Sequence, residues 1–138
     1  MSVGLLLICH EYVGAGLLSA AKSICGAYEG NVDDVAVTHA AQPENFLQSI
    51  ERQLEPLDSG SGVLVLSDLY GSTPSNIATQ FYQPGEVAVV LGVNLPMLIR
   101  VFNYSGSDLD ELSIKAAYGG RDGVFIYPPQ IKEDGYAK

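Results

Sequence analysis

The sequence has few basic residues, and this scarcity excludes two classes of partner. Its 138 residues include seven Lys and Arg against sixteen Asp and Glu, for a formal net charge of −9. Nucleic acids and anionic membrane surfaces are bound through clustered Lys and Arg. We therefore expect no nucleic acid and no direct membrane contact.

Cysteine and histidine are also scarce, with two residues of each type. Cys9 and Cys25 lie in apolar stretches and form no CxxC pair, which predicts buried free thiols. A metal site built from so few His and Cys would need acidic ligands at spacings that the sequence lacks. No metal and no cofactor is expected.

Long hydrophobic runs and nucleotide-binding motifs are missing as well. The apolar run of residues 3–9 ends at His10, is too short to span a bilayer and has no basic segment before it. Ser19 replaces the third glycine of a dinucleotide motif, and no GxxxxGK[ST] is present. We expect a cytoplasmic protein with one domain, residues 1–127, followed by a polar tail, residues 128–138.

Apolar runs alternate with amphipathic segments along the whole chain. The expected strands are residues 3–9, 32–38, 62–67, 87–91 and a last short one at 123–127. Helices are expected after the Gly14 and Gly16 turn, after Pro43, and behind three caps, namely Thr73, Asn94 and a Ser107–Asp110 capping box. This alternation predicts an α/β fold with a mainly parallel sheet of about four strands and helices on both faces.

Ligands of such sheets bind at the carboxyl ends of the strands. His10 follows the first strand, Asp68 follows the third, and Thr38 and His39 follow the second. If the first and third strands are neighbours, His10 and Asp68 face each other across one crevice.

A His–Asp pair suits phosphoryl transfer. A carboxylate that accepts the N–H of one ring nitrogen leaves the other nitrogen free to attack and stabilises the developing charge. Gly71, Ser72 and Thr73 lead into a helix start, where hydroxyl and backbone N–H groups favour an anion. Simpler interpretations remain: Asp68 as a turn cap, Thr73 as an N-cap only, and His39 as a surface histidine.

Four segments together resemble a known family. They are residues 6–21 around Cys9-His10, residues 62–76 around Asp68-Leu69-Tyr70-Gly71-Ser72-Thr73-Pro74, residues 92–98 (Gly-Val-Asn-Leu-Pro-Met-Leu) and residues 120–124 (Gly-Arg-Asp-Gly-Val). In this order they resemble the mannose-type enzyme IIA domains of the bacterial sugar phosphotransferase system.

The resemblance implies roles for several residues and partners. His10 would be phosphorylated, Asp68 would orient it, and Ser72 with neighbouring amides would hold the phosphoryl group. The donor would be the phosphocarrier protein HPr and the acceptor a IIB-type protein. The resemblance also implies a homodimer in which residues 123–127 form a short antiparallel edge strand, no direct binding of sugar, and membrane contact only through a permease complex.

Two points leave alternatives open. The family commonly has glycine after the histidine, whereas this chain has Glu11, which would repel an anion unless it points away. The sequence carries no IIB domain, so the protein either serves a separate IIB partner or is a regulatory phosphoprotein without transport. A receiver-like domain phosphorylated on Asp68 is a remote alternative, because the first strand ends without an acidic cluster.

Overall fold

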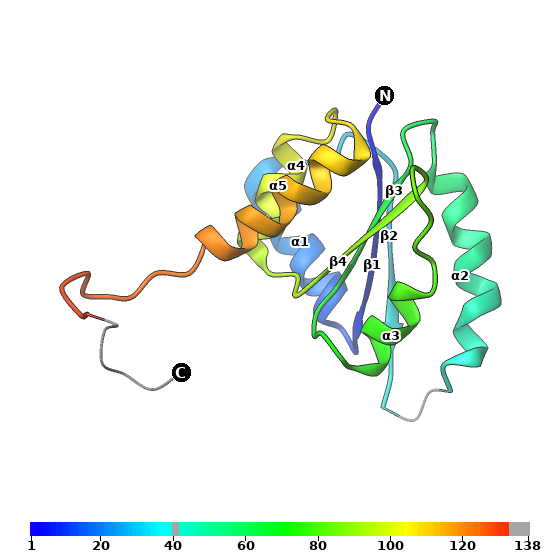
Figure 1. Ribbon diagram of the computed structural model, residues 1–138, viewed down its shortest axis with the longest axis horizontal. Helices are drawn as coiled ribbons and strands as arrows, with labels where there is room; N and C mark the ends of the chain where they lie inside the picture. Colours follow the sequence, from blue (N-terminus) through cyan, green and yellow to red (C-terminus); the bar gives the residue numbers. More distant parts are fainter. Residues whose placement is uncertain (40–41, 133–138) are drawn as a thin grey trace.

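The computed structural model describes residues 1–39 and 42–132 and has three layers, with helices on either side of one sheet (Figure 1). The sheet contains four parallel strands in the order β2-β1-β3-β4. Their bounds are β1 (Gly4–His10), β2 (Val32–Val37), β3 (Val63–Ser67) and β4 (Val87–Leu91).

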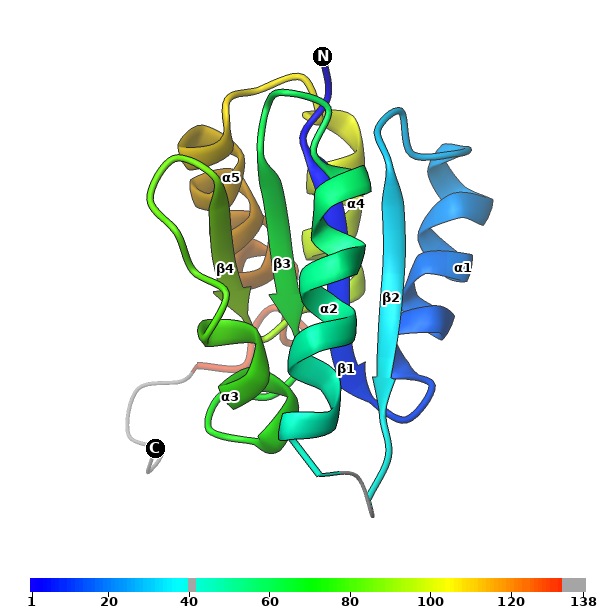
Figure 2. The ribbon, with the colours of Figure 1, turned by 90° about the vertical axis from the view of Figure 1, so that its right-hand side faces the viewer.

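Five helices connect and cover these strands. They are α1 (Val13–Cys25), α2 (Glu44–Leu57), α3 (Thr73–Thr79), α4 (Leu95–Asn103) and α5 (Leu109–Asp122). Figures 1 and 2 show α1, α4 and α5 on one face of the sheet and α2 and α3 on the other. The predicted α/β fold with a parallel sheet and helices on both faces is confirmed.

The two central strands are apolar because both of their faces are covered. In β1, Leu5 and Leu7 pack into the core beneath α1, α4 and α5, whereas Leu6 and Ile8 pack into the opposite core. Alternate side chains of a strand point to opposite faces, so a strand between two helical layers is apolar at every position. No helix of the described residues is both long and apolar enough to cross a membrane.

The strand order places a topological switch point between β1 and β3. The chain passes from β1 to β2 on one side and then returns to β3 on the other side of β1. The carboxyl ends of β1 and β3 therefore meet, with Ile8 paired to Ser67 in the register. Ligands of open α/β sheets bind at this kind of crevice.

Three predicted helix starts differ from the structure. The first helix begins at Val13 and includes Gly14, which packs closely on Leu7 and Cys9 and is therefore a contact residue of the helix rather than a turn glycine. The N-cap of α3 is Ser72, one residue before the predicted Thr73.

The caps of the last two helices show one confirmation and one correction. The Asn94 side chain accepts the N–H of Met97 at 2.9 Å, so the predicted cap of α4 is confirmed. Asp108, not Ser107, caps α5 by accepting the N–H of Glu111 at 2.8 Å.

The predicted strand at residues 123–127 does not form in the single chain. Helix α5 ends at Asp122, and the following residues leave the body of the molecule without regular structure (Figure 1). Phe125 and Tyr127 are 86% and 91% exposed. A strand needs a neighbour with free backbone groups, and none of residues 123–127 pairs with a described strand. The end of the expected tail, residues 133–138, lies outside the described residues.

Candidate active site

His10 and Asp68 meet at the switch point. His10 is the last residue of β1, and Asp68 directly follows β3. The Nδ1 atom of His10 lies 2.9 Å from Oδ2 of Asp68, with side-chain exposures of 41% and 13%. The contact that strand adjacency predicted is therefore present, and it leaves the imidazole accessible while the carboxylate is mostly covered.

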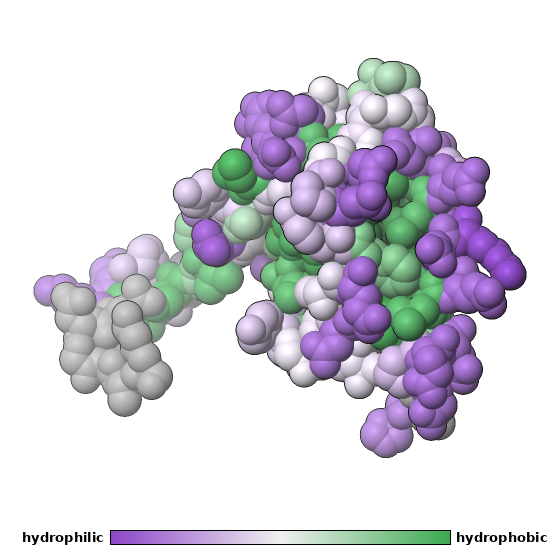
Figure 3. Space-filling view, turned by 45° about the vertical axis from the view of Figure 1, so that its right-hand side comes forward, coloured by the Kyte–Doolittle hydropathy of each residue, from purple (hydrophilic) through white to green (hydrophobic). Residues whose placement is uncertain are grey.

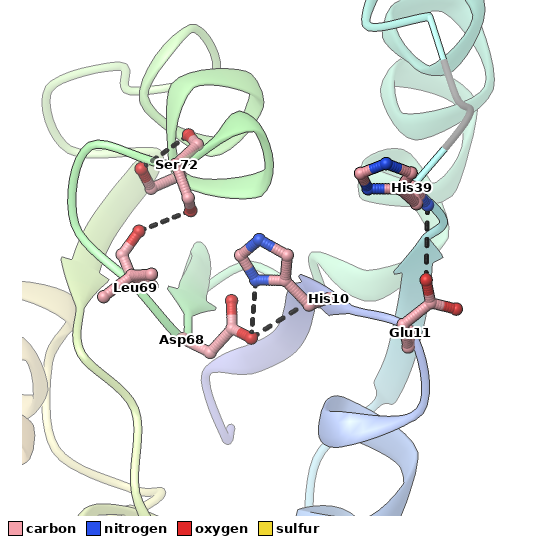
Figure 4. Close-up of polar contacts among 7 residues, drawn as sticks. His10, Glu11, His39, Asp68, Leu69 and Ser72 are labelled. Carbon is pink, nitrogen blue, oxygen red and sulfur yellow. Dashed lines mark hydrogen bonds and ion pairs between the residues drawn. The ribbon is translucent and has the colours of Figure 1, made fainter.

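The same Asp68 oxygen also holds the backbone of His10. The backbone N–H of His10 donates to Oδ2 of Asp68 at 3.0 Å. Two bonds to one carboxylate oxygen fix the ring relative to its own main chain. The ring nitrogen opposite Asp68, Nε2, then points away from the carboxylate into open space (Figure 4).

A small pocket of about 140 Å³ lies beside the ring. One wall comes from Thr73 and Pro74 of α3, and the other comes from Thr38 and His39 behind β2. Binding pockets for drug-sized ligands have volumes above about 300 Å³. The pocket therefore suits a small group rather than a sugar or a nucleotide.

The turn before α3 differs in one respect from the predicted phosphate site. Gly71 has φ +83°, a conformation that favours glycine. The hydroxyl and the backbone N–H of Ser72 both donate to the carbonyl oxygen of Leu69, so both of its donors are occupied. The N–H groups of Gly71 and Thr73 have no partner among residues 1–39 and 42–132, so they are free to donate to a ligand.

The two cysteines differ in their surroundings. Cys9 lies next to His10 in the chain and is fully buried, whereas Cys25 is exposed, so the prediction of two buried thiols is wrong for Cys25. Burial, together with the charges of Asp68 and Asp34, raises the pKa of Cys9 to about 12. Cys9 therefore remains a neutral thiol and does not compete with His10 as a nucleophile.

Glu11 turns away from the His10–Asp68 pair. Its backbone has φ +46°, a region that favours glycine over other residues. Its carboxylate accepts the backbone N–H of His39 at 3.2 Å and points toward the end of β2 (Figure 4). The Glu11 carboxylate therefore lies to one side of the His10 ring, where it repels an incoming phosphoryl group less than it would in front of the ring.

His39 is the site residue that sequence reasoning missed. It is exposed, as expected, yet it lines the same pocket as His10. The available signal was its place at the end of β2, because β2 is the neighbour of β1.

The fold and this site define a class: open parallel α/β proteins with a histidine–carboxylate pair at the switch point. A family model described as "PTS system fructose IIA component", of the EIIA-man family, matches residues 4–117. The chain therefore belongs to the EIIA-man family of the phosphotransferase system.

Known relatives agree with this assignment. The mannose-specific EIIAB component of Escherichia coli K12 is 32% identical over 127 residues, which cover 90% of this chain. The chain spans 39% of the length of that relative and of the Shigella flexneri protein of the same name.

Solved structures show the same fold. A mannose/sorbose-specific IIA subunit from Enterococcus faecalis has a TM-score of 0.79 at 26% identity, covering 96% of this chain and 100% of that one. An EIIA component from Streptococcus agalactiae has a TM-score of 0.78 at 22% identity, covering 91% and 97%.

Proposed function

We propose that this protein is a phosphocarrier that accepts a phosphoryl group on His10 from phospho-HPr and passes it to a IIB-type acceptor during sugar uptake. The observation that carries this proposal is the 2.9 Å contact between Nδ1 of His10 and Asp68 at the switch point. Membership of the EIIA-man family supports it.

The chemistry follows from this contact. With the proton on Nδ1 and donated to Asp68, the lone pair of Nε2 attacks the phosphorus of the donor's phosphohistidine. The N–P bond of the donor breaks as the new N–P bond forms, and Asp68 stabilises the positive charge that develops on the ring. In the second transfer the acceptor attacks phosphorus, the bond to Nε2 breaks, and the neutral imidazole is regenerated.

The turn before α3 supplies donors for the phosphoryl oxygens. Thr73 lines the α3 side of the pocket and offers a backbone N–H and a hydroxyl, and Gly71, two residues earlier in the same turn, has a second free N–H. Ser72 joins them only if its hydroxyl rotates away from Leu69. Because α3 has seven residues, we assign this role to individual N–H groups rather than to a helix dipole.

Exposed apolar side chains flank the pair and suit a protein partner. Tyr12 is 80% exposed two residues after His10, and Leu69 and Tyr70, directly after Asp68, are 61% and 82% exposed. Apolar and aromatic side chains form the centres of protein interfaces. We assign this surface to HPr and then to the IIB-type acceptor, in line with the EIIAB names of the relatives. Sugar would bind to a permease complex, which would also provide the only membrane contact.

The exposed segment after α5 supports a homodimer. Val124, Phe125 and Tyr127 are 75%, 86% and 91% exposed, a costly arrangement for apolar side chains in a monomer. Strand β4 is at the edge of the sheet and has backbone groups available for pairing. We propose that this segment adds to the sheet of a second copy as the short antiparallel edge strand.

The proposed function is tested by incubation with enzyme I, HPr and labelled phosphoenolpyruvate. We expect one acid-labile, base-stable phosphoryl group per chain on His10, located by mass spectrometry and absent from His10→Ala. Label on Asp68, or on a Ser, would overturn the assignment and favour another class of phosphoprotein.

A further inference from the structure

The pocket beside His10 contains little positive charge for a site that is proposed to hold a phosphoryl dianion. Among the described residues that line it, His10 and His39 have the only side chains able to carry a positive charge. Glu11 and Asp68 add negative charge nearby. A phosphoryl group is best held by charge-assisted hydrogen bonds. Once His10 carries the phosphoryl group, His39 is the side chain of the described lining that can donate such a bond.

His39 approaches the pocket from the side opposite to α3. It follows β2, which pairs in parallel with β1 and ends beside His10. Its ring extends toward the space into which Nε2 of His10 points (Figure 4), and both rings line the same pocket. A group attached to Nε2 would therefore lie between the turn before α3 and His39.

Glu11 fixes His39 in this place. Its carboxylate accepts the backbone N–H of His39 at 3.2 Å and so joins the end of β1 to the end of β2. Glu11 does this from a backbone conformation with φ +46° that a non-glycine residue rarely adopts. The strained backbone and the contact together indicate that the Glu11 side chain is held in the direction that positions His39.

We propose that His39 is the second histidine of the phosphoryl site: a ring N–H of His39 donates to a phosphoryl oxygen on His10, and Glu11 is the positioning residue that holds it there. This inference rests on the proposed function. His39 forms no bond to phosphorus and gives up no proton, so the transfer steps described above remain balanced.

The test compares variants in the equilibrium between phospho-HPr and the phosphorylated protein. His39→Ala should shift this equilibrium against phospho-His10 by about 3- to 10-fold, a modest loss because the side chain is exposed. His39→Gln retains an N–H donor and should recover part of the loss. Gln42 lies, like His39, between β2 and α2 but does not line the pocket. Gln42→Ala should therefore give the same equilibrium as the unchanged protein.

A spectroscopic readout separates a direct contact from a structural effect. The ring nitrogen resonances of His39 should shift on phosphorylation of His10, and the phosphorus resonance of phospho-His10 should differ between the unchanged protein and His39→Ala. The backbone bond to Glu11 is retained in His39→Ala, so that variant should keep its fold and melting temperature.

A double-mutant cycle tests the part played by Glu11. Glu11→Gln removes the negative charge but keeps an oxygen acceptor, whereas Glu11→Gly removes both. The difference between these two variants in the equilibrium should therefore overlap with the effect of His39→Ala and should not add to it. Glu29→Gln removes an exposed carboxylate from the loop that precedes β2 and serves as the control.

The outcomes are distinct. If the unchanged protein carries no label on His10, the proposed function fails and this inference fails with it. If His10 is labelled and His39→Ala leaves both the equilibrium and the phosphorus resonance unchanged, only the role of His39 is overturned.

Discussion

One oxygen of Asp68 accepts both the ring N–H and the backbone N–H of His10, at 2.9 and 3.0 Å. This arrangement aligns the ring with its own main chain and selects the tautomer with the proton on Nδ1. It also separates two functions of the carboxylate, because orientation requires only an acceptor whereas charge stabilisation requires an anion.

Substitution of Asp68 should separate these two functions. Asp68→Asn retains an oxygen acceptor but loses the charge, and we expect phosphoryl transfer to His10 to slow by about 10²-fold. Asp68→Ala loses both and should be slower still, with the label still on His10 in each variant. Rapid-quench measurement of labelled protein gives the rates, and a rate for Asp68→Asn equal to that of the unchanged protein would show that its charge has no role.

At the residue scale, sequence predicted the positions of the site but not its hydrogen bonds. The rule that ligands bind at strand ends selected His10 and Asp68, and the structure places them in contact. The occupied donors of Ser72 and the direction of Glu11 depend on local backbone angles and side-chain rotamers. The contact of Ser72 with Leu69 depends on the conformation of a local turn, and the contact of Glu11 with His39 joins residues that become adjacent only after the sheet has formed.

At the scale of elements, two glycines differ in what surrounds them. A Cβ atom added to Gly4, at the start of β1, would overlap the backbone carbonyl oxygen of Leu57 at the end of α2. Gly16 lies on the exposed side of α1, and a Cβ atom there would meet nothing within 4 Å. The first glycine permits close packing of α2 on β1, whereas the second only weakens a helix.

These surroundings predict stability changes of opposite sign. Gly4→Ala should lower the free energy of unfolding by about 1 to 3 kcal/mol, because backbone atoms cannot easily move aside. Gly16→Ala should raise it by about 0.5 to 1 kcal/mol through the greater helix propensity of alanine. Urea unfolding followed by circular dichroism measures both, and equal effects of the two substitutions would contradict this packing.

Element types could be predicted from sequence more readily than their ends. Continuous apolar runs predicted β1 and β3 because strands between two helical layers need no polar face. The start of α1 was misplaced because Gly14 and Gly16 are typical of turns, and only the close contact of Gly14 with Leu7 and Cys9 explains a glycine inside the helix. The cap of α5 was misplaced by one residue because Ser107 and Asp108 are both good N-cap residues.

At the scale of the whole molecule, the apolar side chains of the segment after α5 are not covered by any other described part of the single chain. Sequence predicted a strand at residues 123–127 from its apolar composition, yet its described residues pair with nothing and extend from the body (Figure 1). Figure 3 shows apolar surface continuing along this extension on the face drawn. A pattern of apolar residues indicates that a segment will be covered, but it does not indicate by which chain.

The proposed dimer predicts a specific response to charge in this segment. Phe125→Asp should shift the molar mass from that of a dimer toward that of a monomer, because a carboxylate would be buried in the interface. Gln130→Asp adds the same charge to a polar position three residues beyond this segment and should leave the molar mass unchanged. Light scattering coupled to size-exclusion chromatography measures both, and a Phe125→Asp protein that remains a dimer would exclude this segment from the interface.

The central claim is that the contact of Nδ1 with Asp68 leaves Nε2 of His10 as the atom that carries the phosphoryl group. The most direct test is nitrogen and phosphorus NMR of the protein labelled in its histidine rings and phosphorylated by phospho-HPr. We predict phosphorus bonded to Nε2 of His10, with the proton on Nδ1 retained. Phosphorus on Nδ1, or on any other residue, would contradict the account.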